Sequence, residues 1–274
     1  MKKLIILSII LLIGLKINAQ EGKYVETNGV KIYYEMYGEG DPLLLLHGFM
    51  SSHKQWEPWK EDLSKKHLLI IPDSRGHGNS SNPSNKFTHK LAAKDMYGLM
   101  DALKIEKFKA IGGSSGGMTL IHMATIDTSR ITSMILIGAT SYYPEESRAI
   151  QRQISYDKQH KDRLAFLETL HPGGEKQIRQ LMIQFNNMAE DYDDMNFTAP
   201  YLSTIKSKTL IIHGDSDVFF PIDIPITSYK AIPNSYLWIV PNAGHMPFGF
   251  NEKKSIWADV FLKVIEDFFE GKWK

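Results

Sequence analysis

The chain has 274 residues, with no cysteine and with 32 basic against 31 acidic residues. This length suits one α/β domain with or without an insertion, and a 43% hydrophobic content is enough for a large core. The balanced charge gives no global field that would attract nucleic acid. Without cysteine the chain can form no disulfide and carries no lipid-modified cysteine.

Residues 1–19 predict a signal peptide. Met1 to Lys3 is basic, Leu4 to Leu15 is mostly apolar, and Ala19 is a small residue that signal peptidase accepts, so the predicted cut precedes Gln20. The apolar run is short for a membrane span; the alternative is an uncleaved anchor. We therefore expect an exported protein without a stable span after cleavage. A bacterial periplasm fits large cysteine-free exported domains best, and secretion is the other possibility.

Strand and helix patterns alternate along the rest of the chain. Asn28-Gly29 between β-rich runs predicts a hairpin over residues 23–37. Apolar runs predict buried strands at 43–46, 67–72, 108–111, 131–137, 208–213 and 236–240, and helical spacing is present at 55–66, 88–103 and 254–269. This alternation indicates a largely parallel sheet.

The pattern changes after Thr140. No strand is expected from 142 to about 200, and residues 152–170 and 175–189 have helical patterns. We interpret residues 141–200 as a helical lid inserted into a core made of 20–140 and 201–274. Asp191, Asp193 and Asp194 are interpreted as a solvated acidic run and not as a metal site.

The most informative motif is Gly112-x-Ser114-x-Gly116, which fits the G-x-S-x-G nucleophile elbow. Such a turn is crowded, so glycine is needed two positions before and after the serine. Gly113-x-Ser115-x-Gly117 fits the same pattern, so Ser115 is the alternative nucleophile. A phosphate-binding P-loop is not indicated, because Met118 stands where that motif needs lysine.

Two further groups follow predicted strands in the order Ser114, Asp217, His245. A serine hydroxyl needs a neutral imidazole to take its proton, and that imidazole needs a carboxylate to hold its tautomer. We predict Ser114 as nucleophile, His245 as base and Asp217 as acid. Gly244 is expected to let the histidine loop approach the elbow.

The segment after the strand at 43–46 supplies a predicted oxyanion hole. The chain bend at His47-Gly48 places backbone N–H groups near the top of the sheet, and we predict the Phe49 and Ser115 amides as donors. The His47 side chain is given no catalytic role. In the loop at 73–80, Asp73 and Arg75 are expected to pair with each other, and His77 lacks the partners of a metal ligand.

Together these motifs resemble the α/β-hydrolase family over about residues 23–270. The resemblance implies an eight-stranded, mostly parallel sheet flanked by helices, with a cap inserted after the sixth strand. It implies the roles given above for Ser114, Asp217 and His245, with Asp215 as the competing acid, and it implies no cofactor and no metal. The matching segments are 47–48, 73–80, 112–117, 214–217 and 244–245.

Within the family, the serine at the elbow separates the chain from haloalkane dehalogenases and epoxide hydrolases, which carry aspartate there. Ser115 stands where proline iminopeptidases typically have tryptophan. The chain looks most similar to serine esterases of the lactonase and haloperoxidase-like branch, so the expected activity is cleavage of a small ester or lactone. An aminopeptidase that uses Glu168, Glu175 or Asp191 to hold an amine is one alternative. A ligand-binding or signalling protein with little turnover is the other.

Overall fold

The computed structural model describes residues 22–249 and 255–273. The predicted signal peptide at 1–19 lies outside these ranges. None of the helices within them has the length and hydropathy of a bilayer-spanning segment.

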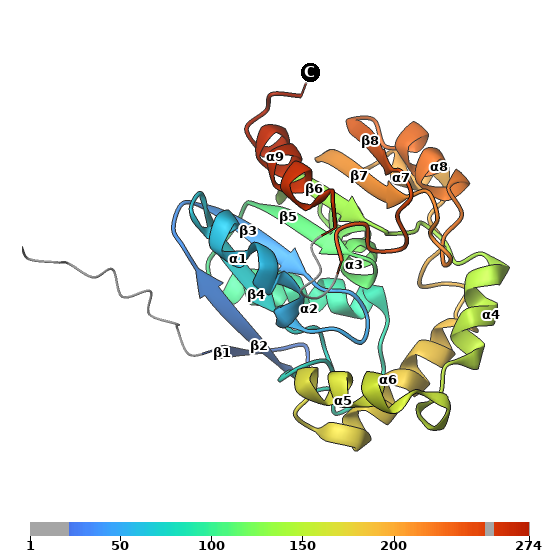
Figure 1. The fold of residues 1–274 in the computed structure, drawn as a ribbon. Coiled ribbons are helices and arrows are strands. Elements are labelled where there is room, and N and C mark those ends of the chain that lie inside the picture. Colours follow the sequence, from blue (N-terminus) through green and yellow to red (C-terminus); the bar gives the residue numbers. More distant parts are fainter. Residues whose placement is uncertain (1–21, 250–254, 274) are drawn as a thin grey trace, which may run out of the picture.

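One sheet of eight strands forms the centre of the molecule (Figure 1), as predicted. The strand order is β1-β2-β4-β3-β5-β6-β7-β8. Strand β2 is antiparallel to both of its neighbours, β1 and β4, and strands β3 to β8 are all parallel to one another. The bounds are β1 Lys23–Thr27, β2 Val30–Tyr37, β3 Asp41–Leu46, β4 His67–Pro72, β5 Phe108–Gly113, β6 Ile131–Ile137, β7 Lys208–Gly214 and β8 Ser235–Val240.

Helices cover both faces of the sheet. The helices are α1 Glu57–Ser64, α2 His89–Ala102, α3 Ser115–Ile126, α4 Glu145–Gln153, α5 Lys161–Leu170, α6 Gly174–Met188, α7 Ala199–Leu202, α8 Asp223–Ala231 and α9 Ala258–Phe269, with short 3-10 turns η1 His53–Trp56 and η2 Tyr156–Lys158. The Thr88 hydroxyl accepts a hydrogen bond from the Leu91 amide at the start of α2, so the predicted threonine cap is confirmed.

Successive side chains of a strand point to opposite faces of the sheet, so the apolar core has one part on each face. Leu44 and Leu46 pack with α2, α3 and α8, whereas Leu43 and Leu45 pack with α1 and α9. Because both faces are covered, the parallel strands are apolar at nearly every position, and this explains the continuous apolar runs in the sequence.

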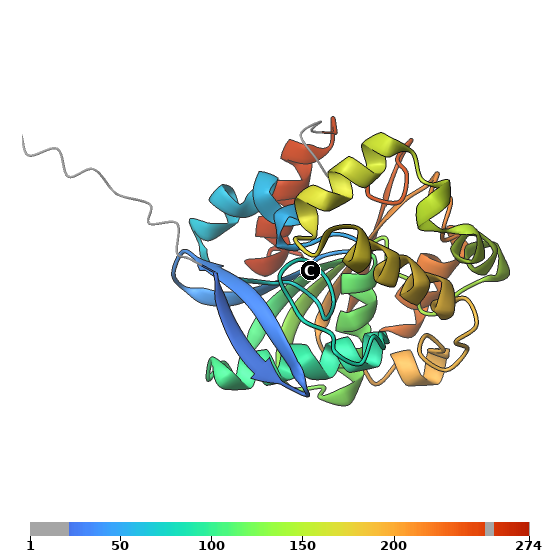
Figure 2. The same cartoon turned by 90° about the horizontal axis from the view of Figure 1, so that it is seen from below.

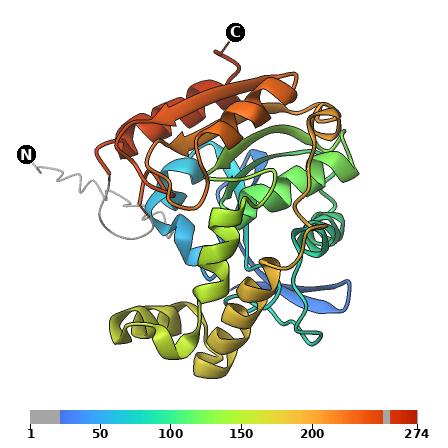
Figure 3. The same ribbon diagram turned by 90° about the vertical axis from the view of Figure 1, so that its right-hand side faces the viewer.

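The segment between β6 and β7 is helical and forms a cap, residues 141–200. Helices α4, α5 and α6 lie at one end of the molecule, away from α9 (Figure 3). Viewed from that end, α6 crosses in front of the sheet (Figure 2). The cap has a separate apolar cluster, in which Leu167, Ile178 and Leu181 pack with Met50 of the core. The cap therefore packs on the loop after β3.

The helix boundaries inside the cap differ from the prediction. The expected single helix at 152–170 is wrong, because α4 begins at Glu145 and ends at Gln153, and Ile154 and Ser155 then take extended backbone. Two glutamates in the first turn favour a start at Glu145 through the helix dipole.

Outside the cap, the helix predicted at 254–269 is described from Ala258, and α8 was not predicted.

The expected pair between Asp73 and Arg75 is also wrong. Arg75 instead makes two hydrogen bonds, of 2.6 and 2.8 Å, to the buried carboxylate of Asp95 on α2. Asp73 accepts hydrogen bonds from the His53 backbone amide and Nδ1 and from the Asn79 amide. Both charges are therefore satisfied by partners distant in sequence.

Candidate active site

The turn between β5 and α3 is strained at one residue. Ser114 has φ +51° and ψ −118°, a backbone conformation that non-glycine residues rarely adopt. Its amide donates to the Ile137 carbonyl at 2.7 Å, and its carbonyl accepts from the Met118 amide at the start of the helix. These bonds hold the strained residue in place.

The flanking glycines are required by close contact. A Cβ on Gly112 would lie 2.5 Å from the backbone of Gly116 and Gly117, and one on Gly116 would lie 2.3 Å from the Leu46 carbonyl oxygen. Strands β3 and β5 and the first turn of α3 therefore meet with no room for a side chain, as the motif predicts.

The structure brings the three predicted side chains into one hydrogen-bonded chain. Ser114 Oγ lies 2.9 Å from His245 Nε2, and His245 Nδ1 lies 2.8 Å from Asp217 Oδ2. An ionised carboxylate can only accept, so Nδ1 carries the proton and Nε2 presents a lone pair to the serine hydroxyl. This is the geometry in which an imidazole can take a proton from serine.

The side chain of Asp217 is fully buried and accepts several hydrogen bonds. Its Oδ1 accepts from the Phe219 amide at 2.8 Å and the Phe220 amide at 3.2 Å. Burial alone would raise the pKa of this carboxyl, but the hydrogen bond from His245 and the backbone amides outweigh it and lower the pKa. Asp215, the competing acid, is exposed and accepts from the Ala243 amide and the Ser216 hydroxyl instead.

The close approach of the histidine loop depends on a glycine that the sequence analysis missed. A Cβ on Gly244 would meet nothing within 4 Å, so the role expected for Gly244 is wrong. Gly138, after β6, has φ +55°, and a Cβ there would lie 2.4 Å from the His245 carbonyl oxygen. The rings of Phe219 and Phe220, at 4.9 and 5.3 Å between centroids, complete the support of His245.

The two amides predicted for the oxyanion hole flank the serine. Within the described residues neither the Phe49 nor the Ser115 amide donates a hydrogen bond, and both residues line the same cavity as Ser114. The loop that carries Phe49 is braced by neighbours: the Gly48 amide donates to Gln55, and buried His47 Nδ1 donates to the Gly48 carbonyl. His47 thus has a structural role.

A cavity of about 410 Å³ opens above Ser114 between the sheet and the cap. Its walls are mainly apolar. The core contributes Gly48, Phe49, Met50, Ser51, Ser114, Ser115, Met118, Phe219, Phe220 and His245, and the cap contributes Tyr143, Gln151, Ile154, Arg163, Phe166, Leu167, Leu170, Phe185 and Met188. A space of this size suits a small or medium-sized organic substrate.

A second serine–histidine–aspartate chain lies beside the first and was not predicted. Ser115 Oγ is 2.9 Å from His89 Nε2, and His89 Nδ1 is 2.7 Å from Asp194 Oδ2. The interpretation of Asp194 as a solvated residue is therefore wrong. Asp194 is buried, and it also accepts hydrogen bonds from the His89 and Lys90 amides at the start of α2. Asp193 is exposed, and Asp191 is half-buried, with its carboxylate accepting from the Asp193 and Asp194 amides.

The two serine–histidine–aspartate arrangements differ in how far their histidines are exposed to solvent. The side chain of His245 is 17% exposed, whereas that of His89 is fully buried. Ser115 has a hydroxyl held by His89 and lies in the first turn of a regular helix, while Ser114 occupies the strained turn. The geometry therefore favours Ser114 over Ser115 as the nucleophile.

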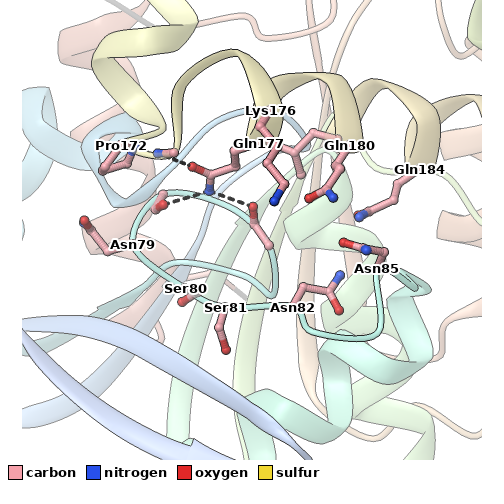
Figure 4. Close-up of a pocket in the computed structure, with 14 residues that line it drawn as sticks. Asn79, Ser80, Ser81, Asn82, Asn85, Pro172, Lys176, Gln177, Gln180 and Gln184 are labelled. Atoms are coloured by element: carbon pink, nitrogen blue, oxygen red, sulfur yellow. Dashed lines mark hydrogen bonds between the residues drawn. The ribbon is translucent and has the colours of Figure 1, made fainter.

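No group of three or more potential metal-ligating side chains occurs within residues 22–249 and 255–273. A second hollow, of about 360 Å³, lies between α6 and the loop at 76–85 (Figure 4). Amide and hydroxyl side chains dominate it, and Gln177 Nε2 donates to the Gly76 and Gly78 carbonyls at 2.9 Å each. We interpret these bonds as a tie between cap and core.

The family model for the alpha/beta hydrolase fold matches residues 41–174 and 167–252. The chain belongs to this family. It is similar to the human protein named serine hydrolase BPHL, with 30% identity over 259 residues that cover 90% of this chain and 85% of the relative.

Two solved structures share the fold of this alpha/beta hydrolase. A meta-cleavage product hydrolase from Pseudomonas fluorescens has a TM-score of 0.73 at 24% identity and covers 92% of this chain and 98% of its own. The enol-lactonase from Burkholderia xenovorans has a TM-score of 0.69 at 21% identity and covers 90% and 100%. At these identities the likeness shows the fold and not the substrate.

The cap of this alpha/beta hydrolase is joined to the loop after β3 through buried His171, and this contact is expected to weaken in acid. His171 Nε2 donates to the Met50 carbonyl at 3.2 Å, and its Nδ1 accepts from the Gly78 amide at 3.0 Å. Burial lowers the pKa of His171 to about 4. Between pH 6.5 and 4 the unfolded chain therefore binds a proton that the folded protein does not, so stability falls as pH falls.

The His171→Gln variant, which keeps a donor and an acceptor, should lose this dependence. Over this range the free energy of unfolding of the wild type should fall by about 3 kcal/mol more than that of the variant, an order-of-magnitude figure. Urea unfolding of both proteins at several pH values measures the difference. Parallel pH profiles would contradict the assignment.

Proposed function

We propose that this alpha/beta hydrolase cleaves small carboxylic esters or lactones through an acyl-enzyme on Ser114. The observation that carries the proposal is the continuous chain from Ser114 through His245 to buried Asp217, at the base of an apolar cavity. No cofactor or metal takes part in this scheme.

The first half of the reaction forms the acyl-enzyme. His245 Nε2 takes the hydroxyl proton as Ser114 Oγ attacks the substrate carbonyl carbon, and Asp217 stabilises the imidazolium that results. The Phe49 and Ser115 amides donate to the oxygen that becomes negative, and each such donor contributes about 3–4 kcal/mol. His245 then gives its proton to the leaving alkoxide as the C–O bond breaks.

The second half reverses the same proton path. A water molecule gives a proton to His245 Nε2 and adds to the acyl carbonyl, and the second tetrahedral species collapses to release the acid and the serine hydroxyl. In a lactone the leaving alkoxide stays attached to the acyl group, so a single hydroxy acid is released.

The cavity lining disfavours the aminopeptidase alternative. An aminopeptidase needs an acidic group to hold the free amine of its substrate, and among the described residues that line the cavity none is acidic. Glu168 and Glu175 are exposed, and Asp191 does not line the cavity either. The intact chain to Ser114 likewise disfavours a binding protein without turnover.

Replacing the proposed nucleophile should remove almost all turnover. We expect Ser114→Ala to lower kcat by about a million-fold, because the acyl-enzyme can no longer form. A screen of the purified mature protein against chromogenic short-chain esters, lactones and aryl amides measures it, with thermal unfolding as a check on folding. Full activity in the variant would refute the assignment.

The two candidate acids can be separated by matched substitutions. Asp217→Asn should lower kcat by about ten-thousand-fold, because the amide can stabilise the wrong tautomer of His245. Asp215→Asn removes a carboxylate two residues away that does not contact His245, and it should leave kcat within a few-fold of the wild type. The reverse order of the two losses would assign the role to Asp215.

We propose that the protein is exported, and the basic and apolar pattern of residues 1–19 supports this. The full-length chain expressed in a Gram-negative host should be recovered from the periplasm or the medium with Gln20 as its first residue. Intact-mass measurement and N-terminal sequencing test this. Recovery of the uncleaved chain in the membrane fraction would favour an anchor instead.

A further inference from the structure

Ser115 lines the substrate cavity, directly beside Ser114. The Ser115 hydroxyl belongs to the buried chain through His89 to Asp194, which joins α3, α2 and the cap. The contact between Asp194 and His89 serves to tie the cap to α2. The contact between His89 and Asp194 does not require a serine at position 115, so the presence of Ser115 needs a separate explanation.

The direction of the protons in this chain follows from Asp194. Its carboxylate accepts from the His89 amide at 2.7 Å, the Lys90 amide at 3.1 Å and His89 Nδ1 at 2.7 Å. Burial would raise the pKa of Asp194, but the nearby His89 and these donors hold it well below its usual value, so the group is ionised. In the neutral form of the His89 ring the single proton is therefore on Nδ1, and Nε2 is the acceptor.

Ser115 must then donate its hydroxyl proton to His89 Nε2. A hydroxyl has one proton and two lone pairs, so what remains on Ser115 Oγ are acceptor sites. Because His89 is fully buried and its tautomer is fixed by Asp194, the polarity of Ser115 is fixed as well.

A second residue of the cavity wall also carries an acceptor. Gln151, on α4, is almost fully buried and lines the cavity, and its Oε1 has no hydrogen-bond partner among the described residues. A buried acceptor without a partner costs free energy. The acceptor sites on Ser115 Oγ favour a substrate that brings a hydrogen-bond donor into an otherwise apolar space.

We propose that Ser115 Oγ is an acceptor subsite for a hydroxyl group on the carbon next to the scissile carbonyl, so that the preferred substrates are esters or lactones of 2-hydroxy acids. The inference rests on the proposed function. Ser115 follows the nucleophile directly and its amide is a predicted oxyanion donor, so its side chain lies near the first carbon of the acyl group. Its hydroxyl would contact the substrate, and His89 and Asp194 act as positioning residues.

The donor is a neutral hydroxyl and not an ammonium group. The carboxylate of Asp194 already accepts from three N–H groups, and no described residue on the cavity wall is acidic. An ammonium group would therefore be buried in this cavity without a charged partner, which is costly.

Three phenyl esters of one size test the proposal: propionate, lactate and alaninate. Each kcat/KM is divided by the rate constant of uncatalysed hydrolysis of the same ester, because an α-hydroxyl group itself activates the ester. On this scale the wild type should favour the lactate over the propionate by about tenfold, the value of one neutral hydrogen bond. In Ser115→Ala this corrected ratio should fall to about one. Because the two esters are compared within each protein, any general effect of the substitution on the oxyanion hole cancels.

The positioning role of His89 is tested by removing the acceptor of the Ser115 proton. In His89→Phe a ring of similar size has no nitrogen to accept from Ser115 Oγ, so the hydroxyl can turn its proton toward the cavity. The ester of 2-methoxypropionic acid, which can only accept at that position, should then gain about tenfold relative to the propionate, a change that a purely structural role of His89 would not produce.

Equal corrected kcat/KM for lactate and propionate in the wild type, or an unchanged corrected ratio in Ser115→Ala, would overturn the proposal. A preference for the alaninate would overturn it in favour of an ammonium site. Binding of the anilides of lactic and propionic acid to Ser114→Ala gives a readout without turnover, and equal affinities there would also refute the subsite. Loss of ester hydrolysis as such bears on the proposed function alone.

Discussion

The hydrogen bond between the Ser114 hydroxyl and the His245 imidazole joins residues 131 positions apart in sequence. It exists because β5, β7 and β8 run parallel, so that the elbow, the Asp217 loop and the His245 loop all leave the sheet at the same edge. The apolar packing on both faces fixes the register of these strands. The fold therefore holds the side chains of Ser114 and Asp217 at hydrogen-bonding distance from that of His245.

Strain at Ser114 and crowding around it have a common origin. The left-handed backbone of Ser114 exposes its hydroxyl at the base of the cavity, and it is held by backbone bonds to β6 and to the first turn of α3. Gly138, Gly112 and Gly116 remove the side chains that would push these segments apart. The Phe49 and Ser115 amides, the proposed oxyanion donors, make no hydrogen bond within the described residues.

Much of this arrangement could be predicted from the sequence, because it depends on local signals. Buried parallel strands appear as apolar runs, the elbow has a glycine pattern, and Ser114, Asp217 and His245 stand after strands in a recognisable order. The partners of Arg75, Asp194 and Ser115 could not be predicted, since each lies on an element whose position is set by tertiary packing. A buried carboxylate such as Asp194 also looks, in sequence, like a solvated member of an acidic run. The role of Gly138 depends on a loop that approaches from another part of the chain.

The central claim is that Ser114, and not Ser115 beside it, is the activated hydroxyl. Reaction of the protein with a fluorophosphonate, followed by proteolysis and fragmentation mass spectrometry of the peptide that holds both serines, tests it most directly. The account predicts one adduct, on Ser114, because only this hydroxyl combines the strained turn with a partly exposed histidine. An adduct on Ser115, or none at either serine, would contradict it.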